Sequence, residues 1–130
     1  MRADKVSERY QAYGNSKMAL MLYTRDLAKR LAGTGVVVNA VHPGWIRTKL
    51  ATATLQKSSF LARTLLPLLR MRPAWYGART IVYLASDPQL TATGEYFINK
   101  KIVASNATSR DPVLAHALTE ATRTFLAPYL

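Results

Sequence analysis

The sequence predicts an α/β fold, namely the C-terminal part of a doubly wound parallel sheet with few strands and about four helices. Three observations lead to this prediction. A helical pattern runs directly into a short β-branched segment that a Pro-Gly turn ends. Only two segments are convincing strands, and two parallel strands leave both sheet edges open. The chain also begins on a helix with no strand before it, so we expect part of a sheet.

The first two elements are a helix over residues 10–32 and a strand over residues 36–41. Apolar residues recur in the helix at helical spacing without an intervening proline: Met18, Met21, Leu22, Leu27 and Leu31. The β-branched run VVVNAV then fits a strand buried on both faces, as in a parallel sheet. Pro43 and Gly44 end this strand. Because ligands bind beyond the carboxyl ends of such strands, the HPG loop is a candidate binding region.

The second half of the chain predicts further helices and one more strand. Residues 50–72 are apolar and basic together, and a proline interrupts them, which indicates short helices with a kink. A helix over 74–85 and a strand at 94–98 follow, and the polar residues 100–111 are expected to form a loop. Pro112 begins a last helix that reaches residue 126. We expect these elements to form one partial domain over residues 1–130.

Composition excludes several kinds of protein. The 130 residues contain no cysteine and two histidines that are far apart in sequence, so we expect neither a disulfide nor a metal site. We identify no signal peptide and no transmembrane span. The 18 Lys and Arg residues outnumber the 7 Asp and Glu residues, which gives a net charge of +11. Such a charge attracts phosphates, anionic lipid or nucleic acid. A nucleic acid is not an expected partner, because no recognition motif accompanies the charge.

One residue pair near the start of the chain suggests catalysis. Tyr13 and Lys17 are four residues apart in the predicted helix, so their side chains share one face. A phenol normally ionises near pH ~10, and an adjacent ammonium favours the phenolate. Such a tyrosine suits proton transfer to a carbonyl oxygen or from an alcohol. The pair alone is a weak signal, since a Tyr-x-x-x-Lys spacing also occurs on ordinary polar helix faces.

Several motifs follow this pair in order. The chain contains AYGNSKMAL, then VVVNAVHPGWIRTKL, and later GART, YLASDP and TGEYF. This arrangement resembles the short-chain dehydrogenase/reductase family, and most closely its retinol-dehydrogenase-like branch. The resemblance extends from about residue 10 to residue 121. It implies a Rossmann-like sheet and an oxidoreductase that uses NAD or NADP to interconvert alcohols and carbonyl compounds.

The resemblance assigns roles to individual residues. Tyr13 matches the catalytic proton donor and acceptor, and Lys17 matches the residue that activates it and binds the nicotinamide ribose. The residues that match the loop passing the nicotinamide are Pro43, Gly44, Ile46 and Thr48, where Ile46 offers its backbone groups to the carboxamide. The segment 50–72 matches the lid over the substrate. Its apolar side chains imply a hydrophobic small-molecule alcohol or carbonyl compound.

The chain also departs from the family pattern. None of its six glycines forms the Gly-rich phosphate-binding turn, and the family's catalytic serine and asparagine are missing. We therefore expect the isolated chain to be incomplete and inactive, whether the sequence is a truncated gene model or a real short product. The resemblance also implies a homodimer and an intracellular location, cytoplasmic or membrane-associated.

A non-catalytic function is the alternative that the sequence leaves open. The basic and apolar segment KSSFLARTLLPLLRMR could lie on an anionic membrane, with leucines toward the lipid and arginines toward the headgroups. The chain would then be a membrane-surface binding module. The competing interpretation is that these leucines face a substrate.

Overall fold

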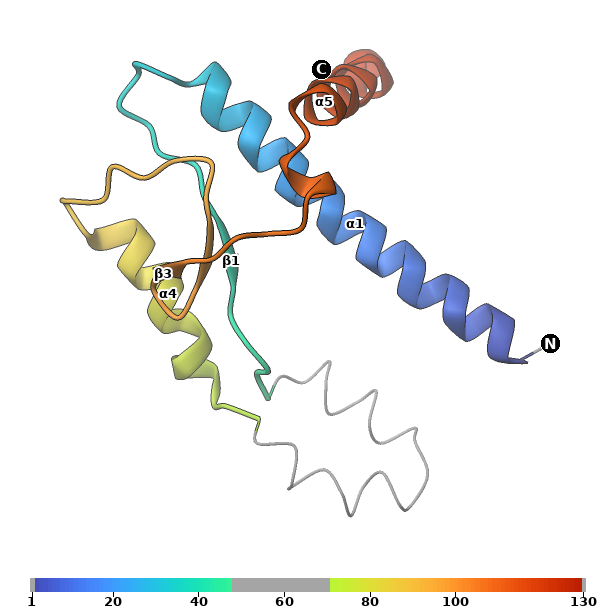
Figure 1. Ribbon diagram of the computed structural model, residues 1–130, viewed down its shortest axis with the longest axis horizontal. Coiled ribbons are helices and arrows are strands. Elements are labelled where there is room, and N and C mark those ends of the chain that lie inside the picture. Colours follow the sequence, from blue (N-terminus) through green and yellow to red (C-terminus); the bar gives the residue numbers. More distant parts are fainter. Residues whose placement is uncertain (1, 48–70, 130) are drawn as a thin grey trace. The chain divides into compact units, whose positions relative to one another are not determined.

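The computed structural model describes residues 2–47 and 71–129 (Figure 1). The chain divides into two compact units. The first unit comprises Met1–Ala40, Thr91–Tyr96 and Ile102–Leu130, and the second comprises Val41–Leu90 and Phe97–Lys101. The α/β class predicted from the sequence is confirmed, with three α-helices and three strands among the described residues.

The first unit is built on the long helix α1 (Arg2–Arg30), drawn in blue in Figure 1. Lys29 and Arg30 in its last turn suit the negative end of the helix dipole. The helix begins eight residues earlier than the predicted start at residue 10. Residues 2–9 contain neither glycine nor proline, so nothing in them interrupts a helix, although they lack the apolar repeat on which the prediction relied.

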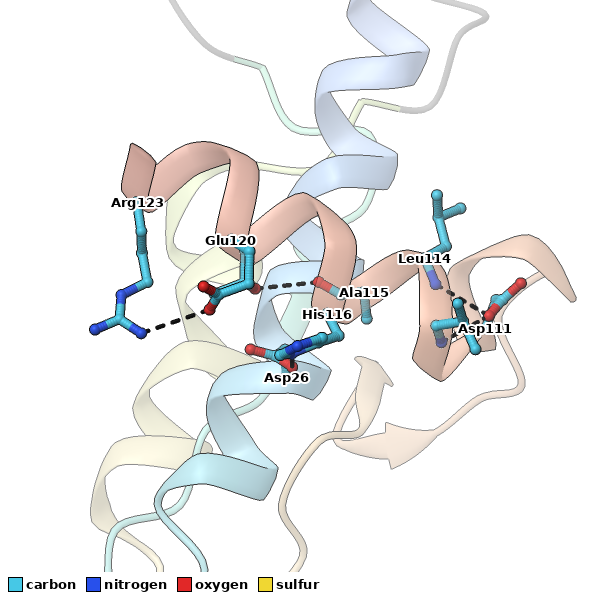
Figure 2. Close-up of polar contacts among 9 residues, drawn as sticks. Asp26, Asp111, Leu114, Ala115, His116, Glu120 and Arg123 are labelled. Carbon is cyan, nitrogen blue, oxygen red and sulfur yellow. Dashed lines mark hydrogen bonds and ion pairs between the residues drawn. The ribbon is translucent and has the colours of Figure 1, made fainter. Parts of the chain in front are cut away.

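Helix α5 (Pro112–Leu126) packs against α1 within the first unit (Figure 1). It begins where the sequence predicted, at Pro112, and Asp111 caps it. The Asp111 Oδ1 atom accepts hydrogen bonds from the backbone amides of Val113 at 2.8 Å and Leu114 at 3.1 Å (Figure 2). The cap satisfies two of the amides that a helix start leaves without partners, which is why the helix starts there.

The interface between α1 and α5 contains a buried carboxylate. Asp26 is only 7% exposed, and its Oδ1 atom lies 3.8 Å from the Nδ1 atom of the exposed His116 on α5 (Figure 2). Ala115 and Thr119 of α5 are also buried. The first unit therefore has small and polar residues in its core. Two short 3-10 helices, η2 (Thr108–Arg110) and η3 (Ala127–Tyr129), flank α5.

The strand predicted over 36–41 is largely wrong, because β1 covers only Ala40–His42. Val36 and Val37 are 53% and 39% exposed, so they are not buried on both faces. Asn39 instead connects this extended segment to residues 92–95. Its Nδ2 atom donates to the carbonyl of Ala92 at 2.7 Å, and its Oδ1 atom accepts from the amide of Glu95 at 3.0 Å. Side-chain bonds thus replace part of the expected backbone ladder.

The sheet has three strands in the order β1-β2-β3, where β2 is Tyr96–Ile98 and β3 is Lys101–Ile102. The bonds from Gly94 N–H to the carbonyl of Val38 and from Ala40 N–H to the carbonyl of Glu95 advance in the same direction, as in parallel pairing. The tight turn between β2 and β3 makes that pair antiparallel. The sheet is therefore mixed, whereas the sequence predicted parallel strands alone.

The third strand corrects the prediction of a loop over residues 100–111. The turn residues Asn99 and Lys100 have positive φ angles of 50° and 64°. Two successive positive φ angles define the type I′ turn that suits two-residue hairpins. The prediction failed because lysine is not a residue that signals such a turn.

The second unit contains α4 (Ala74–Ser86), which follows Pro73 as the sequence predicted. Only α1, α4 and α5 are α-helices among the described residues, compared with the roughly four that were predicted. The short helices expected within residues 50–72 fall mainly on residues 50–70, which lie outside the described part of the chain.

Candidate active site

The Tyr13–Lys17 pair lies on α1 in the first unit. The Nζ atom of Lys17 lies 5.4 Å from the centroid of the Tyr13 ring, within the range of a cation–π contact. Tyr13 is 64% exposed, and Lys17 is exposed as well. The two side chains are therefore neighbours on an accessible helix face, as their spacing predicted.

The residues between the pair keep this face open. A Cβ atom added to Gly14 would meet no atom within 4 Å, so nothing crowds the position after Tyr13. The hydroxyl of Ser16 donates to the carbonyl of Tyr13 at 2.8 Å, which is a local bond within the helix. Ser16 thus uses its hydroxyl proton in a bond to the backbone of its own helix.

The HPG loop follows β1 in the second unit. Gly44 has a φ angle of +87°, a conformation that other residues rarely adopt, and its amide donates to the Nδ1 atom of His42 at 2.9 Å. Pro43 has no amide hydrogen with which to continue a ladder. These properties turn the chain sharply after the strand.

Ile46 presents its backbone groups in a defined direction. It forms an isolated parallel bridge with Arg72, in which Arg72 N–H donates to the carbonyl of Trp45 at 2.8 Å and Arg47 N–H donates to the carbonyl of Arg72 at 2.9 Å. The bridge thus uses the carbonyl of Trp45 and the amide of Arg47, the two residues next to Ile46. In parallel pairing the amide and carbonyl of Ile46 itself then point to the opposite side. They form a donor and an acceptor side by side.

Gly77 of α4 supports this loop, and sequence reasoning assigned it no role. A Cβ atom at position 77 would lie 2.8 Å from Cγ1 of Ile46, 3.0 Å from its Cδ1 atom and 3.4 Å from Cβ of Pro43. Only a glycine therefore lets α4 approach the loop this closely. The available signal was a glycine inside a helix, since such a residue often has a packing reason.

The structure brings the predicted residues together in two groups. Tyr13 contacts Lys17 in the first unit, whereas Pro43, Gly44 and Ile46 lie on one loop of the second unit. Thr48 lies outside the described residues, as do positions 50–70 of the predicted lid. A metal site is not formed by the described part of the chain, which holds no suitable group of three or more His, Cys, Asp or Glu side chains.

Comparison with known proteins agrees with these motifs. The sequence profile of a family described as Enoyl-(Acyl carrier protein) reductase matches residues 1–99. Retinol dehydrogenase 13 of Homo sapiens is 38% identical over 111 residues, which are 82% of this chain and 34% of that protein. Retinol dehydrogenase 12 of Bos taurus is 40% identical over 104 residues, or 78% of this chain and 31% of that protein.

A third relative carries the family name itself. Dehydrogenase/reductase SDR family member 13 of Bos taurus is 37% identical over 116 residues, or 87% of this chain and 30% of that protein. The chain thus spans about a third of the length of these relatives. The α/β fold, the ordered motifs and these matches show that the chain belongs to the short-chain dehydrogenase/reductase family. Within the family, its sequence is of the retinol-dehydrogenase-like kind.

One further structural finding concerns membrane-spanning helices. The helices formed by residues 2–47 and 71–129 include none with the length and apolar character needed to cross a bilayer.

Proposed function

We propose that this chain carries the proton-transfer half of an NAD- or NADP-dependent site that interconverts an alcohol and a carbonyl compound. The observation that carries the proposal is the contact between Lys17 and Tyr13 on an exposed face of α1, with 5.4 Å between Nζ and the ring centroid. Tyr13 gives its hydroxyl proton to a carbonyl oxygen in one direction. In the other direction it accepts the proton of an alcohol.

Lys17 has two functions in this proposal. Its positive charge stabilises the phenolate that Tyr13 forms when it gives up its proton. Its ammonium group also carries three hydrogen-bond donors, which suits the hydroxyls of a ribose. A methionine at this position would keep the length of the side chain and remove both the charge and the donors.

The loop after β1 fits the amide end of the cofactor. Ile46 presents one amide hydrogen and one carbonyl oxygen on the same side, and a carboxamide offers the matching acceptor and donor. Pro43 and Gly44 turn the chain so that this edge is formed directly after the strand. When bound, the nicotinamide supplies or accepts the hydride. The family resemblance also assigns Thr48 a hydroxyl contact with the cofactor.

The cofactor's phosphates have no comparable site in this sequence. Its six glycines form no phosphate-binding turn, so the chain by itself should hold the dinucleotide weakly or not at all. We propose on the same ground that the isolated chain is inactive. We also propose that the substrate is a hydrophobic small-molecule alcohol or carbonyl compound, which the names of two relatives, both retinol dehydrogenases, support.

A hybrid enzyme tests the proposal. In it, this chain replaces the matching part of human retinol dehydrogenase 13, so that the relative supplies the residues that the chain lacks. Oxidation of retinol is followed through the absorbance of the reduced cofactor. Tyr13→Phe should lower the rate by about 10²- to 10⁴-fold, the contribution of a general acid or base, and Lys17→Met should also lower it.

The matched control is Tyr10→Phe on the same helix. Tyr10 is 73% exposed and has Gly14 rather than a lysine four residues later. This variant should keep the rate of the unmodified hybrid. A folded Tyr13→Phe hybrid that loses no more activity than Tyr10→Phe would contradict the assignment of Tyr13.

A further inference from the structure

A small cavity lies in the second unit, between α4 and the turn that joins β2 to β3. Its volume is about 140 Å³. The residues that line it are Tyr76, Arg79, Thr80, Asn99 and Lys100. Pockets for drug-sized ligands usually measure about 300–1,000 Å³. The cavity is therefore suited to one small chemical group rather than to a whole cofactor or a retinoid.

The lining favours an anion. It contains a guanidinium, an ammonium, two hydroxyls and one carboxamide, and none of the five lining residues carries a carboxylate. The whole described part of the second unit has the same bias, because Asp87 is its single acidic residue. Its cationic residues are Arg47, Arg72, Arg79, Lys100 and Lys101.

The fold holds these groups in place from two sides. Tyr76, Arg79 and Thr80 occupy positions i, i+3 and i+4 of α4, so they share one face of the helix. On the other side, the amide of Lys100 donates to the Oγ1 atom of the buried Thr80 at 3.3 Å. The Tyr76 hydroxyl lies 3.4 Å from Oδ1 of Asn99. The hairpin turn is thus tied to the helix by two hydrogen bonds.

The cations around this cavity are held close together without a carboxylate. The guanidinium carbons of Arg72 and Arg79 lie 4.6 Å and 5.3 Å from the centroid of the same Tyr76 ring. The two guanidinium carbons are therefore at most about 10 Å apart, which is close to the Debye length of ~10 Å at 0.1 M ionic strength. Among the residues that the structure describes, neither Arg79 nor Lys100 forms an ion pair.

Arginines that contact a ring can still bind an anion. A guanidinium carries five N–H donors, so a contact with an aromatic ring leaves donors for an oxyanion. The Lys100 ammonium lies 5.4 Å from the centroid of the Tyr83 ring, on a turn residue that also lines the cavity. An anion bound near these side chains would reduce the repulsion among the cations. The hydroxyl of Tyr76 supplies a further polar contact.

We propose that this cavity binds the phosphate group of a phosphate-bearing ligand. Tetrahedral oxyanions match its small volume, its cationic lining and its hydrogen-bond donors. The ligand is either a free phosphate compound or the headgroup of an anionic lipid, since both present the same group. The cavity is independent of Tyr13 and Lys17, so its function does not depend on the proposed oxidoreductase site.

Titration of the full chain with inorganic phosphate tests the proposal, with amide shifts in nuclear magnetic resonance spectra as the signal. Saturable shifts at Thr80 and Lys100 are expected, and sodium chloride at equal ionic strength should not produce them. Lys100→Gln and Arg79→Gln should each weaken binding about ten-fold. Lys101→Gln removes the same charge from the neighbouring residue, which does not line the cavity, and should leave binding unchanged.

A second arm identifies the source of the phosphate. Vesicles of phosphatidic acid in phosphatidylcholine should retain the chain through Arg79 and Lys100 if the ligand is a headgroup. Phosphate shifts without such retention would instead support a soluble ligand. The proposal is overturned if neither probe binds, or if the Lys101 variant loses as much binding as the Lys100 variant. Far-UV circular dichroism checks the fold of each variant. If Arg79→Gln or Lys100→Gln unfolds, Tyr76→Phe is used in its place, because it keeps the ring and removes one hydroxyl of the lining. This variant should also weaken phosphate binding.

Discussion

Replacing Gly77 by alanine tests how tightly α4 packs on the HPG loop. The new Cβ atom would lie 2.8 Å from Cγ1 and 3.0 Å from Cδ1 of Ile46. Both distances are well below the usual contact of about 3.5–4.0 Å between carbon atoms. Ile46 is β-branched and therefore stiff at its first side-chain torsion, so Cγ1 cannot move away without a change of rotamer or a shift of the loop.

Two opposing terms set the size of the effect. Overpacking of this kind costs about 1–3 kcal/mol. Alanine in a helix interior is about 0.8–1.0 kcal/mol better than glycine. The net change at position 77 should therefore be a loss of about 0–2 kcal/mol. Gly14→Ala isolates the helix term, since its Cβ atom would meet no atom within 4 Å, and it should stabilise α1 by about 0.5–1 kcal/mol.

Hydrogen exchange of backbone amides is the appropriate assay, because it reports the opening of each helix separately. Gly77→Ala should lower protection in α4 (Ala74–Ser86) relative to Gly14→Ala in α1 (Arg2–Arg30). The difference between the two substitutions should be about 1–3 kcal/mol, the overpacking term alone. Adding Ile46→Ala removes both crowded atoms and should restore most of the protection. If Gly77→Ala raises protection in α4 as Gly14→Ala does in α1, the close approach of α4 to Ile46 is wrong.

Three further predictions follow from the structure. Asp111→Ala removes the cap of α5 and should cost about 0.5–2 kcal/mol in thermal or urea unfolding, whereas Asp111→Asn should cost little. Burial raises the pKa of the Tyr96 phenol above its ordinary 10.0, so its contribution to stability is complete below pH ~10 and is lost as the pH rises through the folded-state value. Tyr96→Phe should therefore reduce the alkaline loss of stability between pH 9 and 11 in urea unfolding. The isolated chain should give no saturable NADPH fluorescence change at micromolar cofactor, and saturation there would contradict the missing phosphate site.

Sequence patterns correctly predicted the structural features that depend only on residues close together in the chain. The i, i+4 spacing placed Tyr13 and Lys17 side by side, because helix geometry alone decides it. Pro112 likewise marked the start of α5. Both features follow from the nearest few residues, so no distant contact was needed to recognise them.

Features that depend on distant partners were missed. The side chain of Asn39 bonds to backbone groups 53 and 56 residues away, which no local pattern reveals. Gly77 is required by Ile46, a residue on another element. The Asn99–Lys100 turn has two successive positive φ angles, although lysine does not signal such a turn. The hydrogen bond from the Lys100 amide to Thr80 of α4 supports this conformation, and no local pattern reveals it.

The proposed function assigns proton transfer and phosphate binding to different parts of the family pattern, and this sequence contains residues for the first only. The proposed proton transfer needs two residues on one helix, and that helix is formed by a continuous stretch of this sequence. Dinucleotide binding needs backbone groups from several elements, including a Gly-rich turn that the sequence lacks. If the hybrid is active and the isolated chain does not bind NADPH, then the isolated chain lacks cofactor binding and not the groups for proton transfer. An inactive but folded hybrid that binds the cofactor would instead show that the Tyr13–Lys17 pair is not competent for catalysis.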